Sequence, residues 1–290
     1  NISIHMEDKP NMKIRFSADS TCDMNAEFLA RYPVESIPLT VDLEGKSHRD
    51  GVDITPDEII SRVNGGAPLP KTAAVNSEDY RAVFTRLLED CDAVIHFNIS
   101  SDFSCCHQNA TLAAEGLPVY CVDSRNLSSG TALLVAEAYD RANAGMPAEQ
   151  IAEEVRAMVD KIDTSFILDR LDYLYKGGRC SMLSLLGANV LHIRPCIEVV
   201  NGKMVVGKKY RGTYERCLRQ YLADRLRAKD EIVPQRVFIT HTGVSNVAID
   251  SILDIVRSAI PFAEVYETRA GCSITCHCGE NCCGILMVRK

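Results

Sequence analysis

Short apolar runs and longer segments with helical spacing of apolar residues alternate along the first half of the chain. The predicted strands are residues 13–20, 35–43, 92–100 and 118–124. The predicted helices are residues 24–32, 53–63, 76–90, 105–117, 129–145 and 147–162. Strands that alternate with helices at this spacing predict a parallel sheet with helices on its faces. Ligands of such sheets lie where the carboxyl ends of strands meet the amino ends of helices.

The pattern changes after Ile162, where extended segments become more frequent than helices. The β-like segments are residues 166–181, 196–212, 236–243 and 263–290, and the predicted helices are residues 181–191 and 213–229. Asn201-Gly202 lies between two alternating segments and predicts a hairpin turn. The sequence therefore predicts an α/β fold with two domains. A Rossmann-like parallel α/β domain is expected over residues 12–163 and an α+β domain over residues 164–290.

Charge and hydropathy exclude several classes of partner. The 290-residue chain has a formal net charge of −7, which does not suit general binding to nucleic acid phosphates. No apolar run approaches the roughly 18 residues of a membrane span, so stable membrane insertion is not expected. The first residues lack the apolar core of a signal peptide, and a cytoplasmic location is expected.

Cysteines gather near the end of the chain, where five of the 13 fall between Cys272 and Cys283 around His277. An odd number of cysteines in a reducing compartment does not favour a disulfide framework. No CxxC pair of the kind that holds structural zinc occurs. If residues 272–278 form a strand, Cys272, Cys276 and Cys278 share one face and His277 lies on the other. We therefore predict packed thiols and no metal, with a metal-binding or redox protein as the alternative.

Small polar residues between predicted strands and helices are the candidate ligand groups. Ser100, Ser101 and Ser104 precede one helix, where hydroxyls and free backbone N–H groups can bind an anion. Thr72 precedes another helix, for which Asn76 is a candidate cap.

Motifs of catalysis and of nucleotide binding are weak or absent. The basic turn 176–179 lacks the ending of a phosphate-binding loop, and neither GxSxG nor HExxH occurs. Cys105 or Cys106 at a helix start could act as a nucleophile, but the adjacent His107 would not face it. We predict that the protein is not an enzyme.

Six stretches in order resemble the DegV family, whose characterised members bind fatty acids. They are FSADSTCDM, IPLTVDLEGKSHRDGVDITPDEI, KTAAVNSEDY, ISSDFSCCHQNA, LDYLYKGGRCS and GCSITCHCGENCCGI. The resemblance runs from about Lys13 to Val288. Several members of this family are the binding subunit (FakB) of bacterial fatty acid kinase.

The resemblance implies a long-chain fatty acid in a tunnel between the two domains, with no cofactor. By position, the carboxylate-binding residues would be Thr72, Ser104 and His277. Arg179 and Arg211 would serve phosphate handling or docking of the kinase catalytic subunit, and Ser100, Ser101 and Asn76 would support the site. The segment 181–193 could line the tunnel.

The chain also departs from the family pattern. Ala73 to Val75 replace part of the T-S-x-P-S loop, and Cys105-Cys106 replace a Gly-Thr pair. Side chains therefore stand where the family has bare backbone, which predicts a head-group pocket that is narrower or shaped for another lipid. A lipid carrier without a kinase partner remains an alternative.

Overall fold

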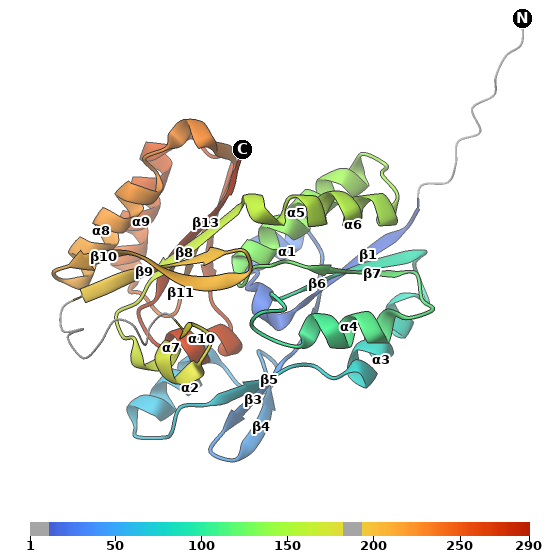
Figure 1. The fold of residues 1–290 in the computed structure, drawn as a ribbon, viewed down its shortest axis with the longest axis horizontal. Coiled ribbons are helices and arrows are strands. Elements are labelled where there is room, and N and C mark those ends of the chain that lie inside the picture. The colour runs from blue at the N-terminus through green and yellow to red at the C-terminus, as the bar shows by residue number, and fades with distance from the viewer. Residues whose placement is uncertain (1–11, 182–192) are drawn as a thin grey trace, which may run out of the picture.

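Four parallel strands form the first sheet of the computed structural model, which describes residues 12–181 and 193–290 (Figure 1). The strands, in sheet order, are β2 (Glu35–Ile37), β1 (Ile14–Asp19), β6 (Ala93–Asn98) and β7 (Val119–Asp123). All neighbours pair in parallel, and every residue of β6 is buried. The parallel sheet predicted from the alternation of strands and helices is therefore confirmed.

Helices connect the strands in this part of the chain, and most of them bury their apolar faces against the parallel sheet. They are α1 (Ala26–Arg31), α2 (Pro56–Asn64), α3 (Ser77–Leu87), α4 (Cys106–Ala114), α5 (Ser129–Asn143) and α6 (Ala148–Ala157). The helix starts agree with the sequence, because Thr55 accepts a hydrogen bond from the backbone N of Glu58. Asn76 accepts one in the same way from the backbone N of Asp79.

A second, mixed sheet is built from the later part of the chain. In sheet order, its strands are β10 (Lys203–Arg211), β9 (Ile193–Val200), β8 (Ile162–Ile167), β13 (Cys283–Arg289), β11 (Ile232–His241) and β12 (Glu264–Arg269). Asn201 and Gly202 both have positive φ, as the predicted hairpin between β9 and β10 requires. The helices of this part are α7 (Asp172–Gly177), α8 (Tyr214–Arg225), α9 (Asn246–Ala259) and α10 (Cys272–Cys278).

A small antiparallel sheet lies beside α2 and α10 (Figure 1). It contains β4 (Lys46–Arg49), β3 (Thr40–Leu43) and β5 (Lys71–Ala73). Glu44 and Gly45 join β3 to β4 with positive φ at both residues. β5 carries Thr72, which pairs with Val41 of β3.

The two large sheets share one apolar core through α5. Phe28 and Leu134 pack in the same cluster as Phe238, Tyr266 and Leu286 of the second sheet. The second sheet begins with β8, so the predicted domain boundary at residue 163 lies inside this strand. The division into two domains remains a prediction. Among the described residues, no helix is both long enough and apolar enough to cross a membrane.

Several sequence-based assignments differ from the structure. The predicted strand at residues 35–43 is two strands, β2 of the parallel sheet and β3 of the small sheet. Residues 272–278 form helix α10 rather than a strand, and residues 172–177 form helix α7 inside a segment predicted as β-like. Helix α9 was not identified from the sequence. The predicted helix at residues 181–191 lies almost entirely outside the described residues.

Helix α10 forms because its residues at spacing i, i+4 contact two different apolar surfaces. Cys272 and Cys276 pack with Val41 and Ile59, near the small sheet. Ile274 and Cys278 pack against a different apolar cluster, which is the large one around β6 and α4. Alternation at period two and helical spacing are both present in CSITCHC, and the surrounding apolar surfaces favour the helix.

Candidate ligand pocket

A pocket of about 560 Å³, partly open to solvent, lies at the carboxyl ends of the parallel strands. Residues that follow all four strands line it, namely Thr21 after β1, Leu39 after β2, Ile99 after β6 and Leu127 after β7. The remaining lining residues are Thr72, Ala73, Ala74, Phe103, Ser104, Arg179, Met204, Ser273, Ile274, His277 and Cys278. A pocket is therefore present at the place where the ligands of parallel sheets bind, and its use by a ligand remains a prediction.

Thr72 and His277 meet at the pocket although they are far apart in the sequence. The Oγ1 atom of Thr72 lies 2.9 Å from Nε2 of His277. Strand β5 positions the threonine, and helix α10 positions the histidine. Ser104 also lines the pocket, so the three residues proposed for carboxylate binding all face one cavity.

Gly177 at the end of α7 leaves room for the other side of the His277 ring. A Cβ atom at Gly177 would overlap Nδ1 of His277. That nitrogen is buried and has no hydrogen-bond partner in the described part of the chain. Burial, and to a smaller extent the nearby positive charge of Arg179, lowers the pKa of His277 to about 4. The imidazole is therefore neutral at pH 7.

The depressed pKa of His277 makes stability depend on pH in acid. In the unfolded chain His277 binds a proton below about pH 6.5, whereas in the folded protein it binds one only near pH 4. The contribution of neutral His277 to the free energy of unfolding is therefore fully present above pH 6.5 and is lost as the pH falls toward 4. We expect wild type to lose roughly 2 kcal/mol relative to His277→Gln between pH 7 and pH 5. Urea unfolding of both proteins at the two pH values measures this difference, and an equal loss in both would contradict it.

Arg179 connects the turn after α7 to the loop that carries Ser104. Its guanidinium donates to the carbonyl of Gly177 at 2.8 Å and to that of Phe103 at 3.4 Å. Arg179 is itself exposed while it lines the pocket, so it lies at the mouth. Its charge is available to an anionic group that enters there.

Ser104 contacts the thiol of Cys106, two residues further along the chain. Its hydroxyl donates to Sγ of Cys106 at 3.1 Å and accepts from the backbone N of Cys106. Burial raises the pKa of Cys106 to about 12, so this thiol stays protonated and does not suit the role of nucleophile.

The other four predicted residues lie outside this pocket. Ser100 is buried and donates to the carbonyl of Gly202, while Ser101 accepts a hydrogen bond from Arg125. Asn76 caps α3. Arg211 is exposed at the end of β10. Their side chains have local structural partners or face solvent, so none of the four is among the residues that line the cavity.

A second pocket of about 320 Å³ continues from the first. Leu127, Ile274 and Cys278 line both pockets. Its buried apolar lining residues include Phe166, Cys282 and Leu286, and its polar ones include Thr164 and Thr240. The second pocket therefore adds apolar wall to the first but also carries polar groups.

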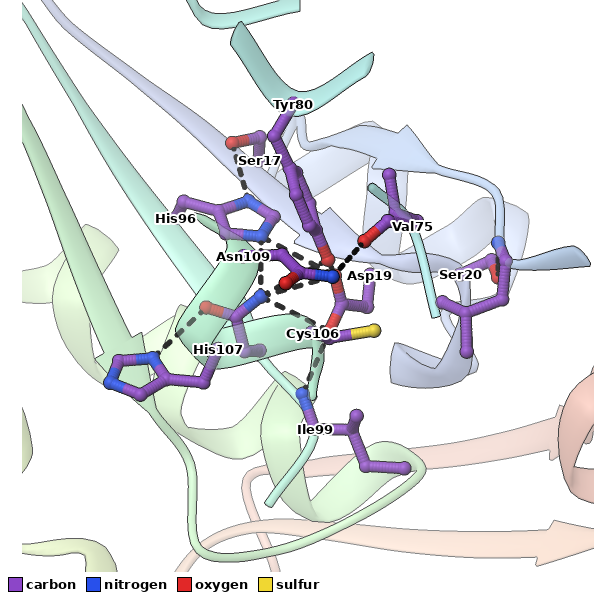
Figure 2. A network of polar contacts seen from close by, with 12 residues as sticks. Ser17, Asp19, Ser20, Val75, Tyr80, His96, Ile99, Cys106, His107 and Asn109 are labelled. Carbon is purple, nitrogen blue, oxygen red and sulfur yellow. Dashed lines mark hydrogen bonds and ion pairs between the residues drawn. The ribbon is translucent and has the colours of Figure 1, made fainter. Parts of the chain in front are cut away.

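A buried carboxylate organises the strand ends beneath the pocket (Figure 2). Asp19 at the end of β1 accepts hydrogen bonds from the hydroxyl of Tyr80 at 2.5 Å and from the backbone N of Ile99 at 2.9 Å. Asn98 donates to the same carboxylate, and Nε2 of His96 lies 3.3 Å from it. These contacts hold the end of β6, and with it the loop that leads to Ser104.

Two polar pocket residues were not identified as candidates from the sequence, namely Thr21 and Ser273. Thr21 follows the first predicted strand, and that position was the available signal. If residues 272–278 formed a strand, Ser273 would lie on the same face as His277. The two do share a face, but because they are one helical turn apart in α10.

The terminal cysteines behave as small hydrophobic groups. Cys272, Cys276, Cys278, Cys282 and Cys283 are free thiols and buried, as predicted. Over residues 12–181 and 193–290, no cluster of three metal-ligating side chains is present.

Comparisons with known proteins agree with this arrangement. Residues 13–290 match a family model described as an uncharacterised protein of the DegV family. A fatty acid-binding protein of Thermotoga maritima is 28% identical over 285 residues, which cover 94% of this chain and 96% of the relative.

Solved structures superpose over nearly the whole chain. A fatty-acid-binding DegV family protein from Thermus thermophilus has a TM-score of 0.86 and 27% identity, covering 96% of this chain and 100% of that one. A stearic acid-binding protein from Eubacterium ventriosum has a TM-score of 0.82 and 25% identity, covering 96% and 98%. Because the family model covers residues 13–290 and a solved structure of the family shares the fold, this chain belongs to the DegV family.

Proposed function

We propose that this protein binds a long-chain fatty acid, with the carboxylate at Thr72, Ser104 and His277. The observation that carries the proposal is the convergence of these three residues on one partly open, largely apolar pocket. Relatives of similar length and fold are described as fatty-acid-binding, which supports the same ligand class here.

The head group would be recognised by neutral donors and one cation. Thr72 and Ser104 can donate hydroxyl hydrogens, and the neutral imidazole of His277 can donate one N–H. Arg179 at the mouth adds a positive charge without lying in a closed cavity. Hydrogen bonds to a charged group contribute about 1.5–3 kcal/mol each, so the set suffices for a specific site.

The acyl chain would run past Ile274 and Cys278 into the second pocket. Both residues line the two pockets, and the inner walls are mainly apolar. Burial of apolar chain contributes about 0.8 kcal/mol per methylene, which favours long acids over short ones.

The proposal extends to presentation of the bound acid to a separate kinase subunit that forms the acyl phosphate. The protein itself would have no catalytic role. Arg179 at the mouth and the exposed Tyr175 and Lys176 beside it supply a charged, aromatic surface next to the head group. Arg211 is a further exposed cation, assigned to the same docking role through the family resemblance.

Native mass spectrometry of the purified protein, with lipid identification after denaturation, tests the function. We expect one fatty acid per chain in wild type. Thr72→Val and Ser104→Ala should each weaken fatty acid affinity roughly 10–100-fold, since each removes a hydrogen bond to a carboxylate. Thr111→Val is the matched control, because the Thr111 hydroxyl is exposed on α4 and bonds only to the carbonyl of His107.

Two results would count against the proposal. Purified wild type that contains no fatty acid and binds none on addition would overturn it. Equal affinity in wild type, Thr72→Val and Ser104→Ala would overturn the assignment of the head-group site. A further experiment adds the kinase subunit from the same genome and ATP to the protein with bound fatty acid. Formation of acyl phosphate would support presentation of the acid to the kinase, whereas its absence would indicate a lipid carrier without a kinase partner.

A further inference from the structure

Two buried hydroxyl groups in the pocket wall have no role in the head-group site. Thr21 and Ser273 are only 2% and 3% exposed, and both line the first pocket. The Oγ1 atom of Thr21 and the Oγ atom of Ser273 have no hydrogen-bond partner in the described part of the chain. Buried hydroxyls are almost always hydrogen-bonded, so a missing partner at a ligand pocket points to a group supplied from outside the chain.

The position of Ser273 relative to His277 defines where that group would be. The two residues are four positions apart in α10 and therefore lie on the same face. Four residues of helix rise about 6 Å along the axis. A polar atom that meets Ser273 would thus lie a few bonds along the chain from a carboxylate at His277.

An unsubstituted acyl chain would leave both hydroxyls buried against methylene groups. In that arrangement each hydroxyl loses its hydrogen bonds to water and forms none with the ligand, which is unfavourable in free energy. A site with polar groups for a ligand hydroxyl discriminates against the analogue that lacks it, because the site groups are then unpaired.

We propose that Thr21 and Ser273 form a second polar contact in the pocket and select fatty acids with a hydroxyl or oxo group near the carboxyl end. This inference rests on the proposed function, since it assumes that the carboxylate is held at Thr72, Ser104 and His277. It assigns a substrate class to the site and identifies the two residues that determine specificity.

Competition binding to delipidated protein tests the proposal with two probes, hexadecanoic acid and 3-hydroxyhexadecanoic acid. We expect wild type to bind the hydroxylated acid roughly 10-fold more tightly. In the double variant Thr21→Val, Ser273→Ala this preference should disappear, because neither replacement can form a hydrogen bond through its side chain. The ratio of the two affinities is the readout, so a uniform loss of folded protein does not imitate the result.

Thr275→Val is the matched control on the same helix. The Thr275 hydroxyl is also buried and unpartnered among the described residues, but Thr275 lines neither of the two pockets. Its replacement should leave the preference unchanged. Equal affinity of wild type for the two acids, as expected if water occupies the hydroxyls, would overturn this inference alone. Failure of both acids to bind would overturn the proposed function and this inference with it.

Discussion

Replacement of Arg236 by methionine is expected to lower the free energy of unfolding by roughly 3–5 kcal/mol. Arg236 of β11 is 2% exposed. Its guanidinium contacts Asp140 at 2.6 Å and Glu137 at 3.3 Å on α5, and Glu264 at 3.3 Å on β12. Methionine fills much of the volume but leaves the buried carboxylate of Glu264 without its main cation. Chemical denaturation followed by circular dichroism measures the loss.

Arg31→Met is the control for this prediction. Arg31 lies at the same 3.3 Å distance from Glu264, but its side chain is 58% exposed. An exposed ion pair contributes about 0–1 kcal/mol, so this variant should remain close to wild type. Equal destabilisation by the two replacements would show that burial does not determine the effect.

The pH dependence gives a second readout for Arg236→Met. Burial alone would raise the pKa of Glu264, but hydrogen bonds from Tyr266 and the charge of Arg236 hold it below its usual value. Without Arg236, burial dominates and the folded state favours protonated Glu264. The difference in stability between wild type and variant should therefore narrow as the pH falls.

Replacement of Gly177 by alanine is expected to weaken fatty acid binding roughly 10–100-fold, the loss expected for a displaced hydrogen-bonding group at a charged ligand. The new Cβ atom would overlap Nδ1 of His277 and come within 3.2 Å of its Cε1 atom. The imidazole must then leave its present position, which disturbs its contact with Thr72, and the head-group site loses its geometry. Fluorescence displacement gives the affinity, and the imidazole NMR signals of His277 report its displacement independently of ligand.

Gly178→Ala separates this effect from a general loss of stability. Gly178 has φ near +70°, but a Cβ atom there would meet nothing within 4 Å. Alanine at this position costs roughly 1 kcal/mol in backbone strain and should leave the His277 signals unchanged. Normal His277 signals in Gly177→Ala would refute the proposed close contact.

Much of the fold follows from local sequence patterns. The buried strands β1, β6 and β7, their parallel arrangement and the caps at Thr55 and Asn76 were all predictable. In each case one signal dominates over a short window, either a continuous apolar run or a side chain that bonds a helix amino end. The local pattern of each of these segments favours a single secondary structure, so tertiary packing did not have to decide between two.

The family motifs also point to part of the candidate site. Thr72, Ser104, Arg179 and His277 line one pocket, as their positions in those motifs implied. Ser100, Ser101, Asn76 and Arg211 do not, because proximity in sequence to a helix start does not determine which way a side chain points. The assigned roles of the pocket residues remain predictions.

Tertiary structure alone determined the conformation of residues 272–278 and the contacts that depend on it. The spacing of apolar residues in this segment fits both a helix and a strand, so contacts with the rest of the protein determine which one forms. One face of α10 packs against Val41 and Ile59, and another packs against the large apolar cluster around β6 and α4. The same packing brings His277 against Thr72 and leaves the hydroxyls of Thr21 and Ser273 unpaired within the described chain. Local sequence determines a secondary structure where its pattern is unambiguous. A contact across 205 residues depends on how the completed elements pack, and no local pattern encodes it.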